Sequence, residues 1–407
     1  MATTDFGALL TNQKVAWARD LWRQARDASF ILKHAGTSST SAIQKITALT
    51  KSEKGDKAIV TLVPELTGVG IAGDQQLTGN EEAASAYDFE IPIDQHRMGM
   101  KSAGRMAEQA TIVNFRKTAR DLLGYRFGTV IDRMGFNLLA GLTVNANPDG
   151  TEPQLTGGGN TGTNLSELAF GGSPVTPTTN RAYRAIANEA IVQGIGAEVP
   201  ASGQQVSTLQ YGHIVNLKAE AISRYIKPVV HSDYGEVYYL WVSPKVMANL
   251  KLDQDFLDNV RHAMPRSKKH DLFVGTDAVM VDGVIVMSHR YVPTNIGAAD
   301  NTAGSAATTG AAGIALPKFA DSDAAVIGTS GQTTTGARCI FMGAQALAMS
   351  DLGAPYWDES DVHDYGNQPG ISIGKLYGMA KPQYLGSYDN PGSAEDFGVM
   401  TLDVAQV

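Results

Sequence analysis

The stretch from Met106 to Leu142 contains no proline and constrains the fold more than any other part of the sequence. Its apolar residues recur at the spacing that one buried stripe of a long helix requires: Ile112, Phe115, Ala119, Leu122, Phe127, Val130, Met134, Leu138 and Leu142. The residues between them are polar or charged and are expected to form a solvated face: Asn114, Arg116, Lys117, Arg120, Asp121, Arg126, Asp132 and Arg133. Such a helix would be roughly 50 Å long, far beyond the average helix. The pattern predicts a spine against which a sheet or other elements pack.

Size and composition limit the kinds of protein this chain can be. A chain of 407 residues is too long for one compact core, so two or more substructures are expected. The formal net charge of −8 argues against a protein that wraps nucleic acid, since such surfaces need an excess of Lys and Arg. Cys339 is the only cysteine, so an internal disulfide is excluded. No segment has the ~18 uninterrupted apolar residues that would span a membrane.

Residues 1–50 begin with a polar lead, and a helix is predicted from Asn12 to Ala28 with Thr11 as its cap. Trp17, Leu21 and Trp22 lie on one side of this helix. One interpretation is a helix that packs on its own core. The other is an arm whose tryptophans anchor on a neighbouring subunit, as aromatic hot spots do.

A long hairpin is predicted for residues 56–94. One strand runs from Lys57 to Val63, and the return strand alternates apolar residues with polar ones from Tyr87 to Asp94. The connection between the strands is rich in glycine and carries Asp74, Glu81 and Glu82. A connection of this length is usually functional or held by a partner, and this one has little apolar material with which to hold its own shape.

The remainder of the chain is predicted from local signals. A loose, glycine-rich region covers residues 143–178, and low-complexity sequence covers residues 297–313. Helices are predicted at residues 180–192, at 211–226 and after the Ser243-Pro244 cap. Asp282-Gly283 is a strong hairpin turn signal. Strands are predicted at residues 237–242, 338–342, 346–349, 371–385 and 397–404, the last two returning to pack on the spine.

Catalytic motifs are scarce. The Asp358–Asp364 segment has the carboxylates and imidazole to hold a divalent cation, but its spacing fits no calcium loop and its flanks indicate a solvated turn. Cys339 lies in an apolar strand pattern typical of a core residue. The basic run from Arg261 to His270 lacks interleaved aromatic residues, so we interpret it as a solvated loop or, second, a subunit contact.

Four segments together carry a family resemblance. They are Lys54 to Val63, Gly73 to Ala83, Ile93 to Arg97 and Phe115 to Leu123. In this order they closely resemble the phage N4-type major capsid proteins of tailed bacteriophages. The resemblance implies an α+β fold of the HK97-like type. In that fold residues 1–50 would be the N-terminal arm, 51–105 the E-loop, 106–229 with 351–407 the peripheral domain, and 230–350 the axial domain.

The function that the resemblance implies is structural. The chain would assemble into an icosahedral shell of hexamers and pentamers around double-stranded DNA, without sequence-specific DNA binding and without a cofactor. Scaffold, portal and decoration proteins are further expected partners. The protein would reside in the virion and, before assembly, in the host cytoplasm. The expected subunit contacts are Trp17, Leu21, Trp22, Asp74, Asn80, Glu81, Glu82, Tyr87 and Phe89.

Other functions remain open at this point. An encapsulin-like nanocompartment would share the fold and enclose enzymes instead of DNA. A metal-dependent enzyme would use the Asp358–Asp364 segment. A soluble binding module is the weakest alternative, because no single pocket is indicated.

Overall fold

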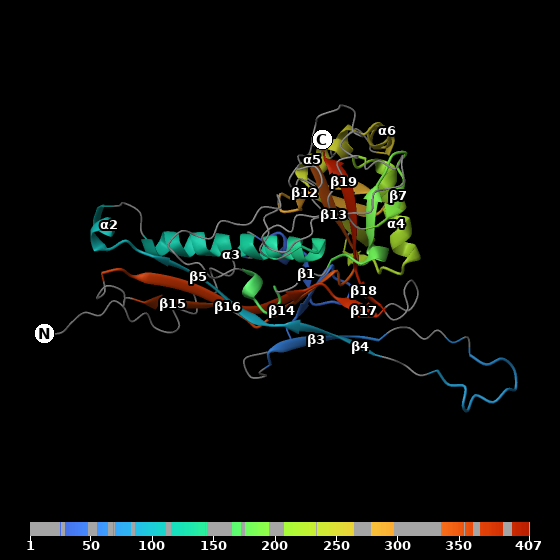
Figure 1. The fold of residues 1–407 in the computed structure, drawn as a ribbon, viewed down its shortest axis with the longest axis horizontal. Helices are drawn as coiled ribbons and strands as arrows, with labels where there is room; N and C mark the ends of the chain where they lie inside the picture. The colour runs from blue at the N-terminus through green and yellow to red at the C-terminus, as the bar shows by residue number, and fades with distance from the viewer. Residues whose placement is uncertain are drawn as a thin grey trace, which may run out of the picture.

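The structure is a computed structural model that describes residues 25, 29–47, 55–63, 68, 70–82, 86–110, 115–142, 144, 165–171, 176–194, 207–232, 234–263, 278–296, 335–353, 355–360, 367–385 and 393–406. Figure 1 shows three parts: an elongated body in which a long helix lies along a sheet, a second body above one end of it, and a hairpin that extends beyond both. We call these the spine body, the upper body and the hairpin. Each of the two bodies packs helices against a sheet.

The spine body is built on the helix α3 (Phe115–Ala140) and a six-stranded sheet. β16 (Gly370–Ala380) is its central strand, with β14 (Leu347–Asp351) and β15 (Tyr356–Ser360) along one edge and β5 (Asp94–Lys101) along the other. β2 (Ile43–Ile46) pairs in parallel with β14 and with β1 (Ala35–Gly36). The short helices of this body are α2 (Arg105–Ala110), η1 (Ile31–Lys33) and η2 (Leu165–Glu167).

The long helix predicted from Met106 to Leu142 differs from the observed structure in two respects. The described part consists of two helices, α2 and α3, and residues 111–114 between them lie outside the described residues. The solvated face does not extend along the whole length, because almost every residue of α3 from Phe127 onward is buried. Asp132, predicted on that face, is only 2% exposed, whereas Leu122 of the predicted apolar stripe is 52% exposed. The second half of α3 is covered by β16 on one side and by the upper body on another.

The upper body contains a nine-stranded sheet with the order β10-β11-β9-β13-β19-β6-β7, to which β8 and β12 add at β9 and β13. Its strands are β6 (Ala182–Ala185), β7 (Ile191–Gln193), β8 (Val229–His231), β9 (Gly235–Val242), β10 (Ala278–Val281), β11 (Val284–Ser288), β12 (Thr294–Ile296), β13 (Thr335–Met342) and β19 (Val399–Gln406). Its helices are η3 (Thr179–Arg181), α4 (Tyr211–Ser223), α5 (Pro244–Leu252) and α6 (Gln254–Ala263). A two-stranded sheet of β17 (Gln383–Leu385) and β18 (Ala394–Asp396) lies near the junction of the two bodies.

Several local signals led to correct predictions in this body. The Ser243 side chain accepts a hydrogen bond from the Val246 backbone N–H and caps α5, as the Ser-Pro pair predicts. Asp282 and Gly283 both have positive φ and connect β10 to β11. The helix predicted at residues 211–226 is α4, and the strands at 237–242 and 338–342 are parts of β9 and β13.

The helix predicted at residues 180–192 is wrong. Only Thr179–Arg181 form a helical turn, and the chain then continues as β6, which pairs in parallel with β19. All four residues of β6 are buried, so both of its faces are covered, and tertiary pairing overrides the helical pattern. Asn188 and Glu189 adopt positive φ in the turn to β7. β6, β7, α4 and β19 all belong to the upper body, so the predicted divisions at residues 229/230 and 350/351 do not coincide with the two sheets.

Candidate assembly surfaces

The hairpin is formed by β3 (Lys57–Leu62) and β4 (Tyr87–Pro92), which pair in register from Lys57↔Pro92 to Leu62↔Tyr87. One of its faces is buried on the chain's own spine body. Ala58, Val60 and Ile91 form a small core with Ala348 of β14. Phe89 lies at an edge of this core with its ring 6.3 Å from that of Tyr384. The base of the hairpin is therefore a fixed part of the subunit.

The opposite face of the hairpin is open. Lys57 Nζ lies 2.6 Å from Glu90 Oε2, and Thr61 Oγ1 lies 2.6 Å from Asp88 Oδ1. Both pairs join the strands across an exposed surface, where ion pairs contribute little stability. Ile59 and Val63 are 58% and 64% exposed on the same hairpin. Apolar side chains left uncovered at such a protrusion indicate a surface that a partner covers.

The tip of the hairpin, residues 70–82, extends away from both bodies (Figure 1). Every residue in it is exposed except Ile71, which is half-buried, and Leu77 is 60% exposed. Local hydrogen bonds shape it, since the Gly79 N–H donates to Glu81 Oε2 at 2.7 Å and the Asn80 N–H donates to the Leu77 carbonyl at 2.9 Å. The tip therefore has turn structure of its own and no covering layer in the described part of the subunit.

The predicted contact residues of the hairpin divide into two groups. Asp74, Asn80, Glu81 and Glu82 are all exposed at the tip. Tyr87 and Phe89 are half-buried near the base, where Phe89 contacts its own chain. The sequence analysis missed the exposed apolar residues Ile59, Val63 and Leu77. The available signal for Leu77 is a large apolar residue within the polar stretch from Asp74 to Glu82.

Trp17, Leu21 and Trp22 of the predicted arm lie outside the described residues. The part of the arm that the structure describes is fixed to the spine body. The Asp132 carboxylate on α3 accepts hydrogen bonds from the Ser29 hydroxyl and from the backbone N–H groups of Phe30 and Ile31. Further along, β2 pairs with β14, and Lys45 Nζ lies 2.6 Å from Asp351 Oδ2. The arm therefore starts from a rigid anchor.

An aromatic cluster surrounds this anchor at the junction of the two bodies. The His289 ring stacks on Phe136 of α3 with centroids 4.8 Å apart and on Phe30 with centroids 4.7 Å apart. Trp241 of β9 meets the Phe30 ring edge-on at 5.1 Å. Burial lowers the pKa of His289 to about 4, and nearby Arg290 adds to this effect. The imidazole is therefore neutral at pH 7 and acts as one more packed ring.

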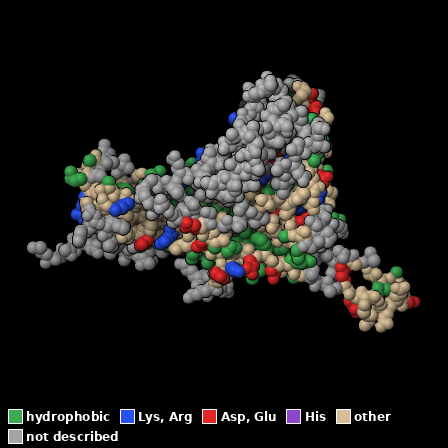
Figure 2. Space-filling view, in the orientation of Figure 1, with side chains coloured by type: hydrophobic (Ala, Val, Ile, Leu, Met, Phe, Trp, Pro, Cys, Tyr) green, Lys and Arg blue, Asp and Glu red, His purple; other side chains and the backbone are tan. Residues whose placement is uncertain are grey.

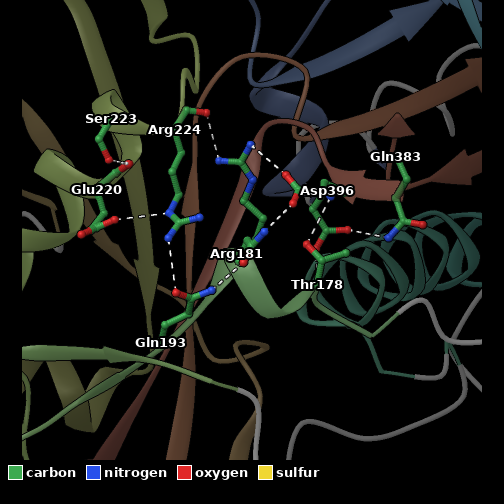
Figure 3. Close-up of polar contacts among 10 residues, drawn as sticks. Thr178, Arg181, Gln193, Glu220, Ser223, Arg224, Gln383 and Asp396 are labelled. Carbon is green, nitrogen blue, oxygen red and sulfur yellow. Dashed lines mark hydrogen bonds and ion pairs between the residues drawn. The ribbon is translucent and has the colours of Figure 1, made fainter. Parts of the chain in front are cut away.

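A polar network joins α4, β7 and η3 of the upper body to β18 (Figure 3). Arg181 donates to the carbonyl of Arg224 at 3.2 Å and lies 3.8 Å from the Glu395 carboxylate. Arg224, the residue that follows α4, in turn lies 3.3 Å from Glu220 in the last turn of that helix. These contacts position the upper body on the strand pair that leads out of the spine body.

Asp396 is the second centre of the same network (Figure 3). It accepts hydrogen bonds from Lys381 Nζ at 2.8 Å and from Gln383 Nε2 at 2.7 Å, and a longer one from the Thr178 backbone N–H. Lys381 and Asp396 are both almost fully buried, and burial lowers the pKa of Lys381. A buried pair with these additional hydrogen bonds holds the orientation of the junction.

The predicted metal segment does not form a solvated turn where it is described. Asp358, Glu359 and Ser360 belong to β15, and Glu359 pairs with Arg116 of α3 and accepts a hydrogen bond from Trp357 Nε1 at 2.7 Å. Within the described ranges no group of three His, Cys, Asp or Glu residues is placed to hold a metal. Residues 361–366 of this segment and residues 264–270 of the basic run lie outside those ranges.

Cys339 is fully buried in β13, and burial raises the pKa of its thiol, so it is not poised as a nucleophile. Among the helices that the structure describes, none is both long and apolar enough to cross a bilayer.

The chain has the fold of several solved capsid structures. It is similar to the capsid of Ralstonia phage GP4, with a TM-score of 0.65, 21% identity, and coverage of 100% of this chain and 98% of that one. It is also similar to the capsid of cyanophage Pam1, with a TM-score of 0.62, 16% identity and 99% coverage of both chains. These likenesses show the fold, which is HK97-like.

Sequence comparison gives the family. The family described as phage capsid protein matches residues 6–407. The major capsid protein of Pseudomonas phage KPP25 is 36% identical over 402 residues, covering 99% of this chain and 97% of that protein. The chain belongs to this family of phage capsid proteins. It is a major capsid protein, a structural component of the virion that forms the bacteriophage head shell from many copies, and this favours the shell over the encapsulin-like and enzymatic alternatives.

Proposed function

We propose that the subunit closes the head shell by placing its hairpin and N-terminal arm across the boundaries between copies, which are arranged as hexamers and pentamers in the manner of phage N4-type capsids. The observation that supports this most is the tip at residues 70–82. It protrudes from the subunit, and Leu77 is exposed on it while Ile59 and Val63 are exposed behind it. Burying these side chains against neighbouring copies would remove apolar surface from water at each contact.

The same proposal covers the contents and the formation of the shell. The net charge of −8 suits a wall around packed double-stranded DNA, because like charges keep the DNA from adhering. Assembly takes place in the host cytoplasm, with scaffold and portal proteins as partners and decoration proteins on the outside. The N-terminal arm contributes Trp17 and Trp22 to contacts with a neighbour.

Replacing residues 63–86 with Asn-Gly tests the role of the hairpin. Leu62 and Tyr87 pair directly, so a two-residue turn can join them without disturbing the base. The shortened subunit is expected to keep its melting temperature and to form no shells in electron micrographs. Normal particles from this variant would contradict the proposal. The packaging part of the proposal is tested separately by nuclease treatment of purified shells. Double-stranded DNA inside the shells should be protected.

A further inference from the structure

One segment of the N-terminal arm, residues 29–46, contacts both bodies of the subunit. It contains η1, β1 and β2, and β1 lies where the two bodies meet (Figure 1). Ile31 and Ile43 in this segment are fully buried in a core to which both bodies contribute. We call residues 29–46 the clamp segment. A segment buried between two bodies is in a position to determine how they are oriented.

The clamp segment is attached to the spine body at both of its ends. At one end, the Asp132 carboxylate on α3 accepts the hydrogen bonds from residues 29–31. At the other end, β2 pairs with β14 along its whole length. Beside this pairing, Lys45 Nζ lies 2.6 Å from Asp351 Oδ2. The segment is therefore fixed to the spine body without any contribution from the upper body.

Between these attachments, aromatic rings of the clamp segment contact the upper body. The Phe30 ring meets the Trp241 ring of β9 edge-on, with centroids 5.1 Å apart. The His34 ring meets the Tyr239 ring of the same strand edge-on, with centroids 5.3 Å apart. Edge-on ring pairs are directional as well as apolar, so they constrain orientation and not only distance. The clamp segment therefore orients β9 relative to the spine body.

The chain itself crosses from the upper body to the spine body through a short link, residues 343–346, between β13 and β14. The first two backbone N–H groups of the link donate to carbonyl oxygens on the upper-body side. The Gln345 N–H donates to the Ser41 carbonyl at 2.8 Å. The Ala346 N–H donates to the Ala42 carbonyl at 2.9 Å. Half of the link is thus held by the upper body and the other half by the clamp segment.

The two bodies also touch directly, at the last turns of α3. The Phe136 ring lies 4.9 Å from the Trp241 ring, and Arg338 of β13 donates to the Ala140 carbonyl at 3.0 Å. These contacts gather at one end of one helix. Contacts at one place, together with a link of a few residues, are the usual composition of a hinge. A second attachment is what prevents such a hinge from turning.

The shape of the subunit makes this angle consequential. The spine body projects well beyond the upper body (Figure 2). α3 has 26 residues and is therefore about 40 Å long. A rotation of about 5° at the junction would move the far end of such a helix by roughly 3–4 Å. A displacement of this size is comparable to the spacing between atoms in contact, so the angle must be held closely for copies to fit together.

We infer that the clamp segment sets the angle between the upper body and the spine body, with the link at residues 343–346 as the hinge that it locks. Both sets of contacts must hold for this, because a segment released from either body cannot position one body relative to the other. The clamp segment continues into the arm, so a neighbour that holds the arm acts on the same angle. That consequence rests on the proposed function, whereas the clamp acts within one subunit.

Two spin labels measure the angle in the unassembled subunit. Glu236→Cys on β9 and Asp358→Cys on β15 place the labels at exposed positions of the two bodies. Cys339 is fully buried and does not compete for the label. Pulsed electron double resonance then gives the distribution of distances between the labels. The natural clamp segment should give one narrow distribution.

The clamp segment is released from one body at a time. Phe30→Ala with His34→Ala removes the ring contacts with the upper body and keeps the backbone bonds to Asp132. Asp132→Ala removes the attachment to α3 and keeps the rings. Each change should broaden the distance distribution roughly twofold and shift its mean, because a hinge without its second attachment samples a range of angles. Lys33→Ala, at an exposed position of η1, is the matched control and should change neither.

Circular dichroism shows that each variant folds, and its melting temperature separates a loosened angle from a general loss of stability. His34→Ala alone is the milder variant and should broaden the distribution in the same direction if the double variant does not fold. Folded variants with lower melting temperatures and distributions as narrow as that of the natural chain would overturn the inference. Equal broadening in Lys33→Ala would also overturn it. No step requires shells, so the result is independent of the 63–86 replacement that tests the proposed function.

Discussion

The Ser29 hydroxyl donates a hydrogen bond of 2.5 Å to Asp132 on the spine helix, across 103 positions of sequence. The same carboxylate accepts from the backbone N–H groups of Phe30 at 2.8 Å and Ile31 at 3.0 Å. One buried side chain thus satisfies the start of η1, where backbone donors have no partner within the turn. This contact determines where the N-terminal arm leaves the subunit.

Asp132→Ala is expected to lower the free energy of unfolding by about 2–4 kcal/mol, because two buried donors and one half-buried donor lose their acceptor. Urea denaturation of the unassembled subunit measures the change. Asp121→Ala, on the outer side of the same helix, serves as the control and should shift stability by less than about 0.5 kcal/mol. Equal losses in the two variants would contradict the anchoring role of Asp132.

The Asp132 contact also shows what the sequence could not predict. Its spacing places it on the polar side of α3, and helical periodicity alone assigns that side to solvent. The residues that bury it, Ser29 to Ile31 and the upper body, come from distant parts of the chain. The helix itself was predictable, because its apolar spacing is local. Its surroundings were not, because they depend on tertiary packing.

The strands and the assembly surface likewise include features that local sequence predicts and features that depend on tertiary packing. The hairpin, the Ser243 cap and the Asp282-Gly283 turn were predictable because each signal lies within a few residues. β6 was not, since its pairing with β19 joins residues more than two hundred positions apart. The acidic tip residues were identified as contacts from composition. Their protrusion beyond both bodies is visible only in the fold (Figure 1).

Arg338→Ala is expected to lower the free energy of unfolding by roughly 3–5 kcal/mol, because it removes one partner of a buried ion pair. Arg338 contacts both carboxylate oxygens of Asp403, at 2.8 and 3.0 Å, and donates to the Ala140 carbonyl at the end of α3. It therefore joins the upper sheet to the spine. Denaturant unfolding measures the loss. The variant Arg338→Met with Asp403→Leu should recover most of the stability, and failure to do so would show that the helix contact matters more than the pair.

Acid should destabilise the subunit through its buried histidines. Burial lowers the pKa of His34, His96 and His289 to about 4, from an ordinary value of 6.5. The unfolded chain therefore binds protons at a higher pH than the folded one. The stability that the neutral rings contribute is complete above pH 6.5 and is lost as the pH falls to about 4.

His289→Phe isolates one of these groups. The substituted ring can still stack between Phe30 and Phe136 but cannot take up a proton. Asp132, whose pKa burial raises, titrates in both proteins and cancels in the comparison. The melting temperature of the natural chain should fall more between pH 7 and pH 4.5 than that of the variant. Parallel curves would show that His289 does not contribute to acid sensitivity.

Gly378→Ala should loosen the base of the hairpin. Gly378 of β16 faces β4, and an added Cβ would lie 2.3 Å from the Pro92 carbonyl oxygen and 3.1 Å from Ile91 Cγ2. A backbone atom cannot move aside as a flexible side chain can, so β4 must shift, at a cost of about 1–3 kcal/mol. Faster hydrogen exchange in residues 57–62 and 87–92 would report this movement. Gly99→Ala is the matched control in the same sheet, where the nearest atom, the Ile371 carbonyl oxygen, lies 3.2 Å from the added Cβ. A hairpin equally protected in both variants would show that its base does not depend on this close approach.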